Sequence, residues 1–373
     1  MILKELSLTN YKNIESAHLQ FSPKLNCIIG SNGMGKTNLL DSIYFLSFAR
    51  SYVYLPDNML IRQGADIAII EGTYEIDDTT EKLLCGLRRG KAKTFRRNKK
   101  EYKKISAHIG TFPLVMTSPA DFDLITGGSE ERRKFMDTII SQHSAPYLTA
   151  LIYYKKLLEQ RNTLLKQFSI DLKTLLVLEE QMAIYAYKIF QHRCLWLKET
   201  APLFLNYYHY ISNNQDDVAL GYIGSFETPL EEITADSIKA EWIASRDKDK
   251  ALGYTSKGPH RDDLEMLLNT ALIRKTGSQG QNKTFLIALK FAQFKMLSDL
   301  YPRLSPILLL DDVFDKLDSH RVDRIVQLVA SNDEFGQIFM TDTNRKYLDQ
   351  ILSQLPPSSY SIFQANRGEF TQI

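Results

Sequence analysis

Short stretches of alternating or clustered apolar residues fill the first third of the chain and predict β-strands. They cover residues 2–8, 17–21 and 25–29, and the last of these leads directly into a glycine-rich segment. Residues 37–48 instead carry apolar side chains at helical spacing. The strand pattern returns from residue 67 to about residue 105, with polar turns, which predicts an antiparallel β layer.

The pattern changes after residue 128. Residues 130–210 contain no glycine, have Pro146 and Pro202 as their only prolines, and place apolar side chains three or four positions apart. We expect two long, antiparallel helices, each of about 30 to 40 residues and roughly 45 to 60 Å long. This segment therefore predicts a short helical arm.

Aliphatic strand patterns return near the carboxyl terminus, at residues 307–310 and 337–340. The complete pattern predicts an α/β fold: a head with a mixed sheet, helices and an antiparallel β layer, interrupted by a helical insert. We expect residues 1–127 and 253–373 to form the head and residues 128–252 to form the arm.

Composition narrows the classes of protein that fit. The chain has 373 residues, 44% hydrophobic and 24% charged, with a formal charge of +2, as expected of a soluble globular protein. Cys27, Cys85 and Cys194 form no Cys-x-x-Cys pair, which disfavours a zinc site and a disulfide framework. No apolar run is long enough for a secretion signal or a membrane span. We expect a cytoplasmic protein whose affinity for nucleic acid depends on local basic clusters.

Two distant segments have the chemistry of ATP hydrolysis. The first matches the phosphate-binding loop pattern and comprises Gly30, Ser31, Asn32, Gly33, Met34, Gly35, Lys36 and Thr37. We expect Lys36 to neutralise the β- and γ-phosphates and Thr37 to hold Mg²⁺. The second, Asp311-Asp312, ends an aliphatic strand. Asp311 is expected to bind Mg²⁺ through water and Asp312 to orient or deprotonate the attacking water, so Lys36 and Asp312 are the predicted catalytic residues.

A loop that precedes the Asp311 strand suggests a shared site. Residues 278–281, Ser-Gln-Gly-Gln, are followed by a predicted helix and resemble the signature loop of ABC-type ATPases. In that superfamily the loop binds the nucleotide held by a partner subunit. The resemblance implies that ATP lies between two heads and that its γ-phosphate meets a second set of residues, here Ser278, Gly280 and Gln281.

Two further segments resemble ABC-type motifs less closely. Residues 316–318, Lys-Leu-Asp, resemble the D-loop that crosses the dimer interface, although Asp318 would equally serve as a helix cap. Thr341-Asp342 stands where that superfamily has a switch histidine. This departure is consistent with slow hydrolysis.

Other stretches resemble one group of these ATPases in particular. Residues 8–13, Leu-Thr-Asn-Tyr-Lys-Asn, resemble the start shared by RecF and SMC-type ATPases, in which the basic residue, here Lys12, reaches the nucleotide phosphates. Further stretches resemble the RecF family of bacterial replication and repair ATPases, namely 38–47, 119–121, 128–137, 258–263 and 278–290. The resemblance covers nearly the whole chain. It places Lys12 and Asn38 with the phosphate loop among the expected ATP-binding residues.

The RecF resemblance implies an ATP-switched DNA clamp. Two heads would close on two ATP molecules, and weak, DNA-stimulated hydrolysis would reopen them. Such a protein is expected to bind single-stranded, double-stranded and junction DNA, to help a RecR-type mediator place RecA, and to support the SOS response. Two alternatives share part of the pattern: the nucleotide-binding subunit of a membrane transporter, and a P-loop kinase. The helical insert disfavours the first, and the loop at residues 278–281 disfavours the second.

Basic residues are concentrated between residues 88 and 104, where Glu101 is the only acid. A hairpin of this kind could follow a phosphate backbone without reading sequence, or it could be an edge hairpin protected by charge. The residues expected to bind DNA are Arg88, Arg89, Lys91, Lys93, Arg96, Arg97, Lys99 and Lys100. Residues 132–134, Arg-Arg-Lys, could face DNA or could form a plain solvated helix face. Residues 260–263, His-Arg-Asp-Asp, fit salt bridges better than metal ligands.

Overall fold

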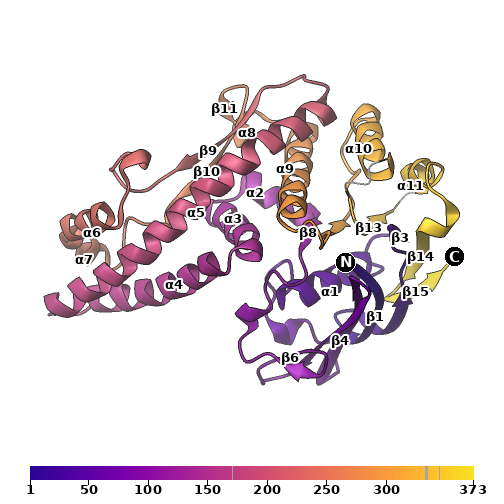
Figure 1. Ribbon diagram of the computed structural model, residues 1–373, viewed down its shortest axis with the longest axis horizontal. Coiled ribbons are helices and arrows are strands. Elements are labelled where there is room, and N and C mark those ends of the chain that lie inside the picture. Colours follow the sequence, from indigo (N-terminus) through magenta and orange to yellow (C-terminus); the bar gives the residue numbers. More distant parts are fainter. Residues whose placement is uncertain (170, 332–334, 344) are drawn as a thin grey trace. The chain divides into compact units, whose positions relative to one another are not determined.

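The chain folds into two units, and neither is formed by one continuous segment (Figure 1). The computed structural model describes residues 1–169, 171–331, 335–343 and 345–373. Unit 1 consists of Met1–Phe122, Leu203–Asp216 and Gly277–Ile373, and unit 2 consists of Asp123–Pro202 and Asp217–Thr276. The head and arm expected from the sequence divide at residues 127 and 252, whereas unit 2 begins slightly earlier, at residue 123. Two larger segments also differ: residues 203–216 lie in unit 1 and residues 253–276 lie in unit 2.

Packing and strand pairing account for both differences. The last turns of α5 (Leu172–Ser212) pack against α9 (Gln279–Leu300) in unit 1, where the ring centroids of Phe204 and Phe285 are 4.5 Å apart. In unit 2, β10 (Asp263–Leu268) pairs with β9 (Val218–Ile223) along its whole length. The returning chain therefore stays in unit 2 until residue 276.

The strands that precede the nucleotide motifs belong to one six-stranded sheet of unit 1. Its order is β15-β14-β3-β13-β12-β8, and all neighbours are parallel except β14 and β15. The bounds are β3 (Leu25–Ile29), β8 (Leu114–Thr117), β12 (Ile307–Leu310), β13 (Ile338–Asp342), β14 (Tyr360–Asn366) and β15 (Glu369–Gln372). Strands β3, β8, β12 and β13 are buried along their whole length, as expected of a parallel sheet covered on both faces. Because β13 lies between β3 and β12, the two nucleotide motifs emerge at the same edge, two strands apart.

The predicted antiparallel layer is the second six-stranded sheet of unit 1, with the order β2-β1-β4-β5-β6-β7. Its bounds are β1 (Ile2–Tyr11), β2 (Ile14–Gln20), β4 (Ile67–Ile76), β5 (Thr79–Arg88), β6 (Thr94–Arg97) and β7 (Lys100–Glu101). Helix α1 (Lys36–Phe48) contacts strands of both sheets and is buried at almost every position. The helix that follows the phosphate loop is therefore held on two sides (Figure 1).

The remaining elements of unit 1 are helical. They are α9 and α10 (Ser319–Ser331), α11 (Arg345–Leu352), and the 3₁₀ helices η1 (Asp57–Met59), η2 (Ile105–Ala107), η3 (Pro119–Phe122) and η5 (Pro357–Ser359). Helix α9 is buried at nearly all positions from Thr284 to Leu297. It is a core helix, and its amino-terminal end carries the signature-like loop.

Unit 2 is mainly helical and contains one small antiparallel sheet, β11-β10-β9. Its other elements are α2 (Asp123–Thr126), α3 (Ser129–His143), α4 (Ala145–Leu165), most of α5, α6 (Ala235–Ala244), α7 (Arg246–Leu252), α8 (Ile273–Thr276), η4 (Leu230–Glu232) and β11 (Ala271–Leu272). No helix in the described part of the chain is both long enough and apolar enough to cross a membrane.

The expected pair of long helices is wrong, because three helices occupy that segment. The first break is at Ser144, whose hydroxyl accepts a hydrogen bond from the Tyr147 backbone N–H and caps α4. Pro146 follows within the first turn, where its missing N–H costs nothing. Pro202, in contrast, lies inside α5, a helix of 41 residues.

Buried ion pairs hold the helices of unit 2 together. Arg161 on α4 is fully buried and binds Glu179 on α5 at 3.0 Å and Asp249 on α7 at 2.7 Å. The second carboxylate charge is balanced by Arg246, which also binds Glu179 and is 22% exposed. Removing one partner would leave a buried charge uncompensated, which costs about 3 to 5 kcal/mol.

Candidate nucleotide site

The phosphate loop has the backbone that its glycines allow. Gly33 and Gly35 have φ angles of 81° and 104°, in the left-handed region that other residues rarely adopt. Lys36, at the start of α1, is only 4% exposed. Its ammonium group donates to the carbonyl oxygens of Gly30 at 2.7 Å and Ser31 at 3.2 Å. The lysine thus spans the loop, and the backbone N–H groups at the start of α1 add to a site suited to phosphate.

Two turns from distant parts of the chain brace this loop. Asn38 donates to the side-chain oxygen of Asn13 at 2.7 Å, next to the turn that carries Lys12. On the carboxyl-terminal hairpin, the Gly368 N–H donates to the Met34 carbonyl oxygen at 2.9 Å. Gly368 has a φ of 89°, and a Cβ atom there would lie 2.5 Å from the Asn13 carbonyl oxygen. The sequence does not predict this contact between Gly368 and the phosphate loop, although Arg367-Gly368 between two strands is a typical hairpin turn.

Thr37 and Asp311, which are both predicted to hold Mg²⁺, lie in contact. The Thr37 hydroxyl donates to one carboxylate oxygen of Asp311 at 2.8 Å, although the two residues are 274 positions apart. Burial, the largest cause, raises the pKa of the Asp311 carboxyl, while hydrogen bonds from Thr341 and Thr37 lower it. A hydroxyl and a carboxylate are hard oxygen ligands, so this pair fits Mg²⁺.

Thr341 contacts both residues of the acidic pair, through the carboxylate of Asp311 and the backbone of Asp312. Its hydroxyl donates to the other Asp311 oxygen at 2.7 Å and accepts from the Asp312 backbone N–H at 3.0 Å. The Lys283 ammonium group on α9 donates to the Asp312 carbonyl oxygen at 3.1 Å. Asp312 itself has a φ of 45°, so its backbone is held in the left-handed region from two sides. From the sequence, Thr341 was noted only because it stands where ABC-type ATPases have a switch histidine. The contact of Lys283 with Asp312 was not expected.

Lys12 is held beside the loop by a carboxylate. Its ammonium group lies 2.6 Å from an Asp41 oxygen and the side chain is 12% exposed. The Tyr11 hydroxyl donates to the same oxygen at 2.6 Å. An ammonium group has three donors, so Lys12 can bind Asp41 and a phosphate oxygen together.

The signature-like loop forms a capping box at the start of α9. The Ser278 hydroxyl accepts from the Gln281 N–H at 3.2 Å, and the Gln281 side chain accepts from the Ser278 N–H at 2.9 Å. Gln281 also donates to Asp216 at 2.9 Å, so its side chain is engaged within the chain. Ser278 is exposed, and its own hydroxyl proton is still available to a ligand. Gly280 is close-packed, because a Cβ atom there would lie 2.8 Å from the Arg321 guanidinium.

Asp318 caps the helix that follows it. Its carboxylate accepts from the Arg321 backbone N–H at 2.9 Å and lies 3.4 Å from the Arg321 guanidinium. The helix-cap interpretation is thus confirmed. Its role as a D-loop residue stays a prediction.

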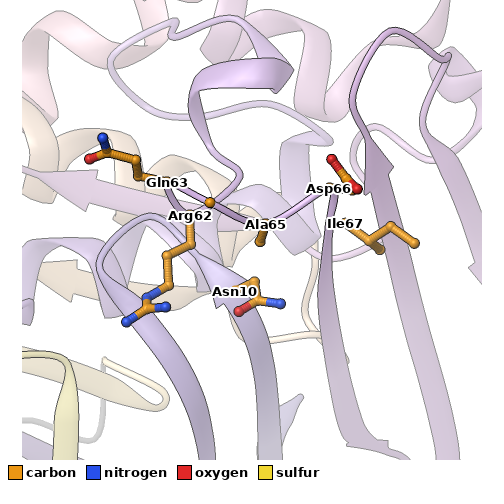
Figure 2. A pocket seen from close by; sticks show the side chains of 7 residues that line it. Asn10, Arg62, Gln63, Ala65, Asp66 and Ile67 are labelled. Atoms are coloured by element: carbon orange, nitrogen blue, oxygen red, sulfur yellow. The ribbon is translucent and has the colours of Figure 1, made fainter.

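An open hollow of about 520 Å³ lies beside the end of β1 in unit 1 (Figure 2). Its lining residues are Asn10, Arg62, Gln63, Gly64, Ala65, Asp66 and Ile67. The Arg62 N–H donates to the Asn10 carbonyl oxygen at 2.8 Å, and the Lys12 N–H donates to the Leu60 carbonyl oxygen at 2.8 Å. The hollow therefore adjoins the turn that braces the phosphate loop.

The basic hairpin contains cations of two kinds. Three of the eight predicted DNA-binding residues make structural contacts: Arg89 donates to backbone carbonyl oxygens, Lys93 binds Asp57 at 3.1 Å, and Arg97 binds Glu81 at 2.8 Å. Arg96 lies 3.8 Å from Glu101. The remaining four are exposed and have no ion pair with any described residue, and we call them the free cations: Arg88, Lys91, Lys99 and Lys100.

The other two basic or ionisable segments have structural roles in unit 2. Arg132 is buried and binds Asp263 at 2.6 Å, so it is not available to DNA. The Nε2–H of His260 donates to the Thr255 carbonyl oxygen at 2.9 Å, and its Nδ1 lies 2.6 Å from the Tyr154 hydroxyl. Burial lowers the pKa of His260 to about 4. Among the described residues, no group of three or more His, Cys, Asp and Glu side chains could hold a metal ion. The salt-bridge interpretation of residues 260–263 is thus favoured by the structure.

Comparison with known proteins agrees with this geometry. Residues 1–220 match the AAA ATPase domain family. A DNA replication and repair protein RecF from Parabacteroides distasonis is 51% identical over 369 residues, which cover 99% of this chain and 98% of the relative. The chain belongs to the RecF family. A second RecF, from Porphyromonas gingivalis, is 50% identical over 376 residues and covers 100% of both chains.

Solved structures of RecF share the same fold. The recombination mediator protein RecF-ATP of the RecFOR pathway has a TM-score of 0.89 at 27% identity, covering 100% of this chain and 97% of its own. An SMC head bound to the C-winged helix domain of ScpA, with a TM-score of 0.58 at 15% identity, shares the fold alone. The family, the ABC-type α/β fold and the ATPase class predicted from the sequence are therefore confirmed, and this RecF-family chain is an ATPase.

Proposed function

We propose that this RecF-family ATPase is an ATP-switched DNA-binding protein of recombinational repair and replication that works as a homodimer. The observation that carries the proposal is the loop at Ser278. Its exposed hydroxyl and the amino terminus of α9 form a phosphate-binding group, yet no hydrogen bond joins Ser278 to the phosphate loop among the described residues. Such a group would bind the γ-phosphate of an ATP molecule held by the phosphate loop of a second copy.

The residues of one chain divide the work of hydrolysis. Lys36 neutralises the β- and γ-phosphates from its position across the loop. Thr37 and Asp311 would hold Mg²⁺, which supplies positive charge to the same oxygens when bound. Asp312 accepts a proton from the water whose oxygen attacks the γ-phosphorus, while the bond to the bridging oxygen of ADP breaks. Thr341 and Lys283 hold Asp312 in place for this step.

The hollow beside Asn10 suits the nucleoside end of ATP. It adjoins the turn that carries Lys12, and its lining includes the Asp66 carboxylate, the Asn10 amide and the Arg62 guanidinium (Figure 2). The guanidinium also binds Glu15 at 2.9 Å. A ribose has hydroxyl groups that such side chains recognise by hydrogen bonds. We therefore place the phosphates at the loop and the nucleoside towards this hollow.

The DNA partner and the pathway come from the family. The relatives are named as DNA replication and repair proteins, and one solved relative as a recombination mediator of the RecFOR pathway. We propose that this chain binds single-stranded, double-stranded and gapped or junction DNA in the cytoplasm. We also propose that it works with a RecR-type mediator, assists RecA loading and supports the SOS response.

The experiment that tests the proposal compares nucleotide states. We expect ATP with Mg²⁺ to shift the wild type from monomer to dimer and to tighten its binding to gapped DNA, whereas ADP does neither. Lys36→Met should abolish both responses, because an uncharged side chain leaves the phosphates without their counter-charge. Sedimentation and fluorescence anisotropy measure the two responses. A wild type that stays monomeric and binds DNA equally with ATP and ADP would contradict the proposal.

The free cations give a separate prediction about DNA. Replacing Arg88, Lys91, Lys99 and Lys100 by Gln should weaken DNA binding at least about tenfold. The slope of log affinity against log salt should become shallower by about one for each phosphate that is no longer neutralised. ATP binding should not change, because none of the four contacts the nucleotide site.

A matched control makes the same change in charge on unit 2, at the exposed residues Lys155, Lys156, Lys173 and Lys188. This variant should bind DNA like the wild type. Titration of labelled gapped DNA at several salt concentrations measures both variants. Equal affinities and slopes for the two variants would remove the hairpin from the DNA-binding surface.

A further inference from the structure

A chain of buried polar contacts runs through unit 1 from Lys12 to α9. It begins with the ion pair between Lys12 and Asp41, which lies on α1 and is 2% exposed. Asp41 accepts from the Ser51 hydroxyl at 3.0 Å and from the Tyr52 backbone N–H at 2.7 Å. The segment that follows α1 is thus fixed to α1 by a single carboxylate.

The Tyr52 side chain continues the chain to the edge of the parallel sheet. Its hydroxyl donates a hydrogen bond to Asp121, just after the end of β8. The other oxygen of Asp121 accepts from the Ser118 N–H at 2.8 Å. Lys290 on α9 closes the chain, because its ammonium group donates to the Tyr52 hydroxyl at 2.8 Å and lies 3.0 Å from Asp121.

The contacts among Tyr52, Asp121 and Lys290 are buried, so their charged groups are compensated within the protein. Asp121 and Lys290 are 6% and 4% exposed, so each charge depends on the other and on the Tyr52 hydroxyl for compensation. Burial, with Asp121 as the next cause, raises the pKa of Tyr52 well above its ordinary value, and the hydroxyl therefore keeps its proton. A fully satisfied buried network of this kind is rigid and allows one arrangement of its parts.

The position of Lys290 gives the network a function. It lies twelve residues after Ser278 on one uninterrupted helix, a rise of about 18 Å. Fixing Lys290 therefore fixes how far α9 slides and rotates, and with it the place of the Ser278 hydroxyl. At the other end, Asp41 lies on the helix that begins at the phosphate loop.

We propose that Tyr52, Asp121 and Lys290 are positioning residues that set the signature loop of a chain relative to its own phosphate loop. Two chains can share two ATP molecules only if this separation is the same in both, because each phosphate loop must face the other chain's Ser278. The inference rests on the homodimer proposed above. It extends that proposal by assigning residues distant from ATP to the pairing step.

The test uses Tyr52→Phe, which removes only the hydroxyl that binds both Lys290 and Asp121 and leaves their direct ion pair in place. We expect ATP affinity within about twofold of the wild type, because Lys12, Asp41 and the phosphate loop are unchanged. ATP-dependent dimerisation and kcat should each fall about 10- to 100-fold, the usual effect of losing a hydrogen bond between charged partners. The matched control is Tyr74→Phe, since the Tyr74 hydroxyl is buried in the same unit without a hydrogen-bond partner among the described residues.

Each outcome decides the question. Loss of dimerisation and kcat in Tyr52→Phe but not in Tyr74→Phe supports the proposal. If both variants dimerise and turn over like the wild type, the proposal is overturned and the proposed function stands. A wild type that fails to dimerise with ATP overturns both. Should Tyr52→Phe fold poorly, the double variant Asp121→Leu with Lys290→Met replaces the buried ion pair by apolar groups of similar size and is read in the same way.

Discussion

Ser278→Asp should abolish the ATP-dependent dimer while leaving the stability of the chain almost unchanged. Aspartate caps helices as well as serine does, so α9 keeps its first turn and its unfolding free energy should change by no more than ~0.5 kcal/mol. The new carboxylate, however, would face the γ-phosphate of the nucleotide on the other chain. Like charges in contact cost several kcal/mol, and a dimer has two such sites, so its dissociation constant should rise at least about 1000-fold.

Sedimentation with ATP measures this effect, and chemical denaturation measures stability. The control is Thr234→Asp, because Thr234 forms the corresponding capping box at the start of α6 in unit 2. That variant should dimerise normally. If Ser278→Asp dimerises as well as Thr234→Asp, the loop at residues 278–281 does not contact a partner's nucleotide.

Asp312→Asn should stop hydrolysis and keep the ATP-bound dimer. An amide cannot accept the proton of the attacking water, and loss of a general base lowers the rate about 10²- to 10⁴-fold. Binding should persist, because the Asp312 contacts to Thr341 and Lys283 are made by its backbone and survive the substitution. The dimer should therefore accumulate.

Phosphate release measures turnover, and sedimentation follows the dimer over time. Asp315→Asn is the control, since Asp315 is exposed and lies three residues further along the same loop. Its turnover should equal that of the wild type. An Asp312→Asn variant that hydrolyses ATP at the wild-type rate would show that another group takes the proton.

The nucleotide site could be predicted because its chemistry lies in short segments whose roles do not depend on distant residues. Eight consecutive residues form the phosphate loop, and the strand before Asp311 is aliphatic throughout. The direction of the strands then decides where the two motifs lie, because parallel strands place both motifs at one edge of the sheet. Thr37 and Asp311 lie in hydrogen-bond contact for this reason.

Residues whose role depends on a distant partner could not be assigned in this way. The sequence shows ten cations between residues 88 and 104, but it does not show that Arg97 differs from Lys99 by its ion pair with Glu81, a residue of the neighbouring strand β5. Asp121 and Lys290 present the same difficulty, because 169 residues separate the two ends of their ion pair. The sequence could have predicted the helix break at Ser144, because a serine two residues before a proline is a typical helix start.

The hydrogen bond between Arg367 and Met34 joins residues 333 positions apart, and this distance has a consequence for protein synthesis. A ribosome adds residues in order, so the phosphate loop emerges early and waits for β12, β13 and the hairpin at residues 360–372 before its sheet is complete. Unit 2, made from residues between 123 and 276, can fold during that interval. The phosphate loop therefore has its complete parallel sheet only after β12, β13, β14 and β15 have been made, which is later than unit 2.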